Sequence, residues 1–193
     1  IRFNSTGPFV LDNVINTTGG NDNSTRVIKV GPTGLGSEDK VVQISTLTIG
    51  HAGTFGLDSG VSSSIYFDGY NGYKIDITGG IAVNRDINLR TRGAMVTVSG
   101  VISGDVANDL NKHEQGTLWL SGNNTYAGVT YVSGGYLVAA HDNALGAGSS
   151  AVTFRGGSFA QLLASGVRTI TRNFDNTGTG STQTLGGLDA GAK

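Results

Sequence analysis

Cysteine is absent from this 193-residue chain, so neither disulfide bonds nor cysteine-ligated metals contribute to its fold. Glutamate occurs only twice, and charged residues make up 14% of the chain, well below the usual share of about a quarter. Helix surfaces are normally built from glutamate, lysine, alanine and leucine, so this composition favours strands. No apolar run approaches the ~18 residues that a membrane-spanning helix needs, and no such span is expected in this chain.

Charge of either sign is also scarce. The chain has 13 basic and 14 acidic residues, for a net charge of −1 at pH 7. Arg85, Arg90 and Arg92 form its densest basic group, and three charges on a strand and its turn indicate a solvated face rather than a track for phosphates. A nucleic-acid partner is therefore not expected, because such proteins carry a clustered basic footprint.

Glycine and short apolar runs are what the chain has in abundance. It contains 32 glycines, and 37% of its residues are hydrophobic. A disordered chain lacks enough apolar surface to offset the entropy of ordering. This chain has such apolar surface and is therefore unlike a disordered chain. Its apolar residues alternate with polar ones, as in Ile87 and Leu89 or Leu118 and Leu120. Period-two runs broken by glycine predict many short strands joined by tight turns.

The strands recur with a regular spacing. The pattern apolar, polar, Gly, Gly, polar, apolar, apolar fills residues 132–138 and again residues 154–160, which lie 22 positions later. A third strand entry begins at Gly116, which lies 19 positions before Gly135. The period is therefore 19 to 22 residues. A unit this short cannot bury its apolar face alone, but it can do so by stacking on its neighbours.

Such stacking predicts an all-β fold, a parallel β-helix or β-solenoid with one unit per coil. The register of equivalent glycines predicts an inward ladder of Leu118, Leu137 and Phe159. The outward ladders expected from the same register are Trp119, Val138 and Ala160, and Thr117, Tyr136 and Ser158.

One segment departs from the pattern. Residues 105–115 lack glycine and carry four charges apart from the histidine, so we expect a loop or one helical turn to leave the solenoid there. No linker or shift of composition divides the chain, and we expect a single domain over residues 1–193.

Residues 116–137 closely resemble the autotransporter-associated β-strand repeat. They follow that family's pattern of strand, Gly-x-Asn-Thr-Tyr turn and second strand, and residues 142–146 match its Asn-Ala-Leu-Gly turn. Residues 98–104 resemble the strand that precedes the repeat, and Lys112 matches a customary lysine. The resemblance is good over residues 98–160. Two departures are His113-Glu114-Gln115, where the family usually has a second glycine, and Val129, where glycine is commoner.

The resemblance implies a right-handed β-helix in a large secreted or surface-exposed bacterial protein, an autotransporter passenger. We expect an extracellular or cell-surface location. Residues 178–188 read as a further coil rather than a polar cap, and Ile1 begins in mid-strand. Because repeat proteins normally carry polar capping units, we expect both ends to continue into a longer chain or into another subunit.

No catalytic, cofactor-binding or metal-binding residue is predicted. Glycoside hydrolysis needs two facing carboxylates, and Asp58, Asp68, Asp76 and Asp86 read as turn residues or solvated strand positions. The three histidines are far apart in sequence and have no metal-ligand spacing.

Exposed aromatic residues are the best candidates for surface recognition. Trp119, Tyr131 and Tyr136 fall on outward positions of adjacent coils, and aromatic residues are enriched at interfaces. The alternative is that these rings cover glycine gaps on the solenoid surface. The favoured function is a structural, non-catalytic surface solenoid of the stalk or adhesin type, which self-associates or binds a surface polysaccharide or protein. The alternatives are a subunit of an extracellular fibre or sheath and, less favoured, a carbohydrate-active β-helix enzyme.

Overall fold

The computed structural model describes residues 2–3, 9–16, 25–30, 41–49, 63–69, 74–83, 86–106, 108–155, 159–177 and 182–188. Before residue 74, side chains are described only for Val41, Gln43, Ile44, Tyr66 and Phe67. None of the described segments is a helix long and apolar enough to cross a membrane.

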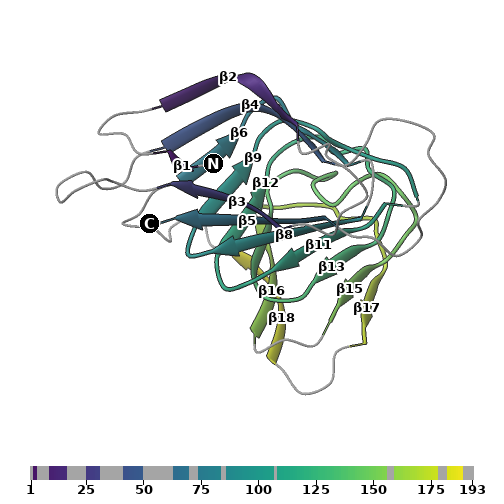
Figure 1. Ribbon diagram of the computed structural model, residues 1–193. Coiled ribbons are helices and arrows are strands. Elements are labelled where there is room, and N and C mark those ends of the chain that lie inside the picture. Colours follow the sequence, from purple (N-terminus) through teal and green to yellow (C-terminus); the bar gives the residue numbers. More distant parts are fainter. Residues whose placement is uncertain are drawn as a thin grey trace.

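The described strands form two sheets, and within each sheet the parallel strands lie side by side along one axis (Figure 1). Sheet A has the order β1 (Arg2–Phe3), β3 (Thr25–Val30), β5 (Ser63–Gly69), β8 (Ile87–Arg92), β11 (Leu110–His113), β13 (Thr130–Val132), β15 (Val152–Phe154) and β17 (Phe174–Asn176). Sheet B has the order β10 (Ile102–Ser103), β7 (Ile81–Val83), β4 (Val41–Ile49), β6 (Lys74–Ile77), β9 (Met95–Val98), β12 (Thr117–Leu120), β14 (Gly135–Ala139), β16 (Phe159–Ser165) and β18 (Thr182–Leu188), and β2 (Phe9–Asn16) pairs with β4.

Apart from β7 and β10, which follow β6 and β9 within sheet B, successive strands of the chain alternate between the sheets, so each coil adds a rung to each sheet. Leu118 of β12 pairs with Val96 of the coil before and with Leu137 of the coil after, always in parallel. From β9 to β18 the spacing between partners in sheet B runs from 19 residues, between Leu118 and Leu137, to 25, between Leu137 and Leu162. The predicted parallel β-helix is confirmed, and its period is wider than the 19 to 22 residues expected.

The core is a set of inward ladders. Residues at one position of sheet B are at most 1% exposed on five successive coils: Ile75, Val96, Leu118, Leu137 and Leu162. Asp76 lies between the fully buried Ile75 and Ile77 and faces outward, as the alternation predicts. The last described residue of this ladder is Leu185, which pairs with Leu162 and is 60% exposed.

The prediction that Phe159 is the third member of the inward ladder is wrong. Leu137 pairs with Leu162, and Phe159 lies on the outer surface, where its ring meets that of Tyr136 edge-on at 5.3 Å. The outward ladders shift equally, so that Val138 pairs with Leu163 and not with Ala160, and Tyr136 pairs with Gln161 and not with Ser158. The connection from β15 to β16 is longer than that from β13 to β14, so aligning the glycine pairs misplaced the register by three residues.

Residues 105–115 do not leave the solenoid as a whole, and that prediction is wrong for Leu110–His113. This segment is strand β11, which pairs with β8 on one side and β13 on the other. Leu110 and Lys112 point inward and are 1% and 0% exposed. A lysine at an inward position broke the apolar alternation and concealed the strand.

Buried polar side chains join the coils. The Asn124 Oδ1 accepts the Ile102 N–H at 2.7 Å from the preceding coil, and the Asn124 Nδ2 donates to the Ala144 carbonyl at 2.6 Å in the following one. The Arg172 guanidinium, 4% exposed, donates to backbone carbonyl groups of Gly128, Leu145, Ser150 and Ala151 and to the Thr130 hydroxyl. A buried polar group costs free energy unless it is hydrogen-bonded, and these side chains are.

Candidate functional site

The outer face of sheet B is apolar and aromatic in its central coils. Trp119 and Tyr136 both lie on this face, as expected, and Tyr136 is 36% exposed. Val138 also faces outward, yet it is only 2% exposed, because it lies in register between Trp119 and Leu163. The aromatic rings therefore cover apolar neighbours on this face and still present part of their own surface to solvent.

Tyr131, the third predicted residue, lies on a different face. It belongs to β13 of sheet A, pairs with Asn111 and Thr153, and points outward between the buried Thr130 and Val132. The guanidinium of Arg155 stacks over its ring, 3.3 Å from the ring centroid. The structure thus brings Trp119 and Tyr136 together on sheet B and separates Tyr131 from them.

The outer face of sheet A is rich in arginine and hydrogen-bonding side chains. One outward ladder runs along the ends of its strands through Tyr66, Arg90, His113, Ser133 and Arg155. Arg90 and Arg92 both lie over the Tyr66 ring, with centroid distances of 5.2 and 4.5 Å. We call the outward residues of this region the sheet A arginine face: Tyr66, Arg90, Arg92, His113, Glu114, Tyr131, Ser133 and Arg155.

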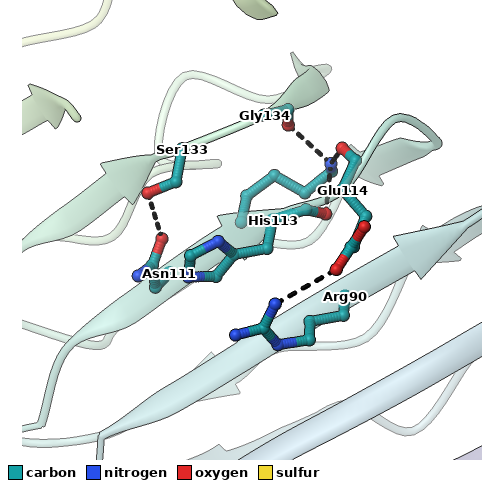
Figure 2. Close-up of polar contacts among 7 residues, drawn as sticks. Arg90, Asn111, His113, Glu114, Ser133 and Gly134 are labelled. Atoms are coloured by element: carbon teal, nitrogen blue, oxygen red, sulfur yellow. Dashed lines mark hydrogen bonds and ion pairs between the residues drawn. The ribbon is translucent and has the colours of Figure 1, made fainter. Parts of the chain in front are cut away.

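The centre of this face is a network of polar contacts (Figure 2). Arg90 Nη1 lies 3.1 Å from Glu114 Oε1, and these side chains are 25% and 30% exposed. The Ser133 hydroxyl, on the same ladder as Arg90, donates to Asn111 Oδ1 on the neighbouring ladder at 2.7 Å. Each contact joins adjacent coils, so the outward side chains are held in fixed positions.

Lys112 supports this network from inside the solenoid. Its Nζ donates to the carbonyl oxygens of His113, Glu114 and Gly134, each at 2.8 Å. An ammonium has three N–H donors, so the group is fully satisfied without a carboxylate. Burial lowers the pKa of Lys112 to about 7, and the nearby Glu114 carboxylate opposes this shift.

His113 is partly exposed beside these cations. Burial, and then the positive charge of Arg90, lower the pKa of His113 to about 4, while Glu114 works in the opposite direction. At neutral pH the imidazole is therefore uncharged and can both donate and accept a hydrogen bond.

Glu114 has a backbone conformation that disfavours its side chain. Its φ of 68° is the only positive value among the described residues other than glycine, and the corresponding turns of adjacent coils have Gly93 with φ 67° and Gly135 with φ 63°. Non-glycine residues held in this region cost ~1–3 kcal/mol, and such strain gathers at functional sites. The strained Glu114 therefore marks the arginine face as a candidate functional site.

The acidic residues considered for catalysis have structural partners. The Asp76 carboxylate accepts a hydrogen bond from the Ser99 hydroxyl at 3.2 Å, and Asp86 accepts the Asp109 N–H at 2.9 Å. Asp58 and the side chain of Asp68 lie outside the described residues.

Asp109 stacks on Asp86 as an acid pair and accepts the Val129 N–H at 2.8 Å from the next coil. Burial, reinforced by Asp86, raises the pKa of the Asp109 carboxyl, whereas the bond from Val129 lowers it. Each carboxylate of this pair therefore binds the backbone of the following coil. Within the described residues, no group of three or more His, Cys, Asp or Glu could hold a metal ion.

Sequence reasoning identified Arg90 and Arg92 but not Arg155 as part of one face. Arg85, the third member of the predicted group, lies outside the described residues. Arg155 could have been found from its position directly after Phe154. That position corresponds to the positions of Ser133 and His113 on earlier coils.

A family model described as the passenger-associated transport repeat matches residues 110–139. This match covers β11 to β14, including Lys112 and Glu114, and agrees with the resemblance seen in the sequence. The chain contains an autotransporter passenger repeat.

The passenger repeat also has a relative among characterised proteins. An adhesin of Brucella suis biovar 1 (strain 1330), named BmaC autotransporter, is 33% identical over an alignment of 119 positions, and the match covers 56% of this chain and 3% of that protein. The chain therefore spans a small part of the length of the relative that it matches. No solved structure matches it.

Proposed function

We propose that this passenger repeat segment is a non-catalytic, adhesin-like scaffold on the bacterial surface, within a longer passenger. The observation that carries the proposal is the way its polar groups are used. The buried side chains of Asn124, Lys112 and Arg172 bind the backbone of adjacent coils, and so do the stacked acids Asp86 and Asp109. Such bonding builds a stiff rod and leaves this acid pair engaged in structure. The name of the Brucella relative, an adhesin, supports the same role.

Contact with a partner would occur through Trp119 and Tyr136 on the outer face of sheet B and through Tyr131 on sheet A. Tyr136 offers a ring and a hydroxyl on an exposed position beside Phe159. Tyrosine and tryptophan combine large apolar area with a polar group, which suits them to interfaces.

Attachment of protein-coated beads to an epithelial cell monolayer tests the adhesive role. Beads that carry the 193-residue chain should attach more often than uncoated beads, and Tyr136→Ala should reduce the number attached. Phe174→Ala is the matched control, because Phe174 is an aromatic residue of similar exposure, 41%, on sheet A. Attachment no better than that of uncoated beads would refute the adhesive role.

The non-catalytic role has its own test. Incubation with pectins and alginates, with and without calcium, should release no oligosaccharides. Turnover that Asp86→Asn or Asp109→Asn abolishes would establish the enzyme alternative instead. Light scattering addresses the fibre alternative, since a fibre subunit grows into larger particles as its concentration rises.

A further inference from the structure

We propose that the outer face of sheet B binds a neutral polysaccharide, whose sugar rings stack on Trp119, Tyr136 and Phe159. This inference rests on the adhesive role proposed above and deepens it by naming the chemical class of the partner. Three features of the face carry it: the row that the aromatic rings form, the lack of charge around them, and the polar groups beside them that have no partner in the protein.

The three aromatic side chains form a diagonal row across sheet B. Trp119 belongs to β12, and Tyr136 lies two residues back along the strand on the next coil, since Tyr136 pairs with Thr117. Phe159 lies two residues further back on the coil after that, since Gln161 pairs with Tyr136. Neighbours in the row differ by one coil, about 4.8 Å, and by two residues of strand, about 6.6 Å, so the row is about 16 Å long. An extended chain of a few sugar units has this length.

The rings of this row are held in place and still reach solvent. The Tyr136 and Phe159 rings meet edge-on, with centroids 5.3 Å apart and planes at 74°. Tyr136 is 36% exposed, and Trp119 and Phe159 are partly exposed. A sugar ring presents a face of C–H groups, and an aromatic ring offers it a rigid apolar plane. Because the aromatic rings are already ordered, little side-chain entropy is lost when they bind.

No charged side chain lies among these rings. The outward residues of β9, β12, β14, β16 and β18 are all uncharged. Lys74 and Asp76 of β6 are charged, and they lie beyond Met95 and Thr97 of β9. A face without charge offers no electrostatic attraction to an acidic or basic partner. It also holds no ion that would have to be desolvated when a ligand covers it, so it suits a neutral ligand.

Polar groups beside the row can bind sugar hydroxyl groups. In the part of the chain that the structure describes, neither the Trp119 indole N–H nor the Tyr136 hydroxyl is hydrogen-bonded to the protein. Gln161 lies in register with Tyr136 and adds an amide, whose Nε2 donates to the Thr184 hydroxyl at 3.5 Å. An indole N–H donates, a hydroxyl both donates and accepts, and sugar hydroxyl groups complement both.

The exposed apolar area of this face favours a polysaccharide over a protein. Stable protein interfaces bury about 800 Å² on each partner and have an apolar central region. Among the described large apolar side chains that are at least 36% exposed, only Tyr136 lies on the outer face of sheet B. Val138, between the rings, is 2% exposed. A protein partner or a second copy would therefore find little apolar surface to bury, whereas a sugar chain requires only the rings and their polar neighbours.

Binding of the 193-residue chain to immobilised galactomannan and hydroxyethylcellulose, measured by surface plasmon resonance, tests the proposal. Both polysaccharides are neutral and have extended backbones of flat sugar rings. We expect binding to at least one of them that stays constant as sodium chloride is raised, because salt screens only charged contacts. Tyr136→Ala should weaken this binding by about tenfold, as expected for the loss of one stacked ring. Tyr136→Phe keeps the ring and should lose much less.

Phe174→Ala is the matched control, because it removes an aromatic ring of similar exposure from sheet A. It should bind as the unchanged protein does, and unchanged thermal unfolding of every variant excludes misfolding. Absence of binding to both neutral polysaccharides would overturn the proposal. Equal losses in Tyr136→Ala and Phe174→Ala would also overturn it, as would binding that sodium chloride abolishes. Bead attachment without polysaccharide binding would leave the adhesive role intact and refute this inference alone. Polysaccharide binding without bead attachment would support this inference and refute attachment to epithelial cells.

Discussion

The ammonium of Lys112 and the backbone carbonyl of Gly134, which belong to consecutive coils, are joined by a 2.8 Å hydrogen bond inside the solenoid. Two further bonds, to the His113 and Glu114 carbonyls, hold the turn that follows β11. One side chain thus fixes the turn beneath the arginine face and the next coil together. These three hydrogen bonds explain how a lysine with no carboxylate bound to its ammonium can be fully buried.

Lys112→Met should destabilise the protein by about 2–4 kcal/mol, because three carbonyl groups lose their donor at a buried position. Urea unfolding followed by circular dichroism measures this change. Lys74→Met is the control, since Lys74 is exposed on β6, and its effect should stay within about 0.5 kcal/mol. Equal effects of the two substitutions would show that the Lys112 bonds contribute nothing.

Leu137→Ala should cost about 2–5 kcal/mol, because Leu137 is 0% exposed between Leu118 and Leu162. Leu185→Ala is a matched comparison at the end of the same ladder, where the side chain is 60% exposed. Its cost should be less than about 1 kcal/mol, since folding removes little of the apolar area of this side chain from solvent. A larger loss in Leu185→Ala than in Leu137→Ala would contradict the register.

How far the sequence predicts this molecule depends on whether a residue follows the repeat. Alternation and glycine spacing predicted the parallel β-helix and the Leu118–Leu137 pair correctly. They misplaced Phe159, because the connection before β16 is longer than the one before β14, and aligning the glycine pairs assumes equal connections. They also missed β11, because a lysine at an inward position looks like a loop residue until its carbonyl acceptors are known.

The candidate site was less predictable than the fold. Alternation correctly identified Trp119, Tyr131 and Tyr136 as outward residues, but it could not say that Tyr131 lies on the other sheet. Arg172 was unpredictable for a similar reason. Its acceptors include Gly128 and Leu145, which are 44 and 27 residues away in sequence, and only the stacking of coils brings them together.

Acidification should destabilise the protein through His113. Its folded-state pKa of about 4 lies below the unfolded value of 6.5, so the folded state binds fewer protons between these values. The stability at neutral pH is therefore lost progressively as the pH falls from 6.5 to 4. The urea midpoint of the unchanged protein should drop across this window, and that of His113→Gln should drop less. Identical slopes for the two proteins would exclude His113 as the cause.

Glu114→Gly and Glu114→Ala separate the strain at this turn from its ion pair. Both remove the contact with Arg90, and exposed pairs of this kind contribute only ~0–1 kcal/mol. Glycine adopts a φ of 68° without penalty, whereas alanine keeps the strain that glutamate has. Glu114→Gly should therefore be more stable than Glu114→Ala by about 1 kcal/mol, as measured by urea unfolding. Equal free energies of unfolding for the two variants would show that the positive φ at residue 114 stores no strain.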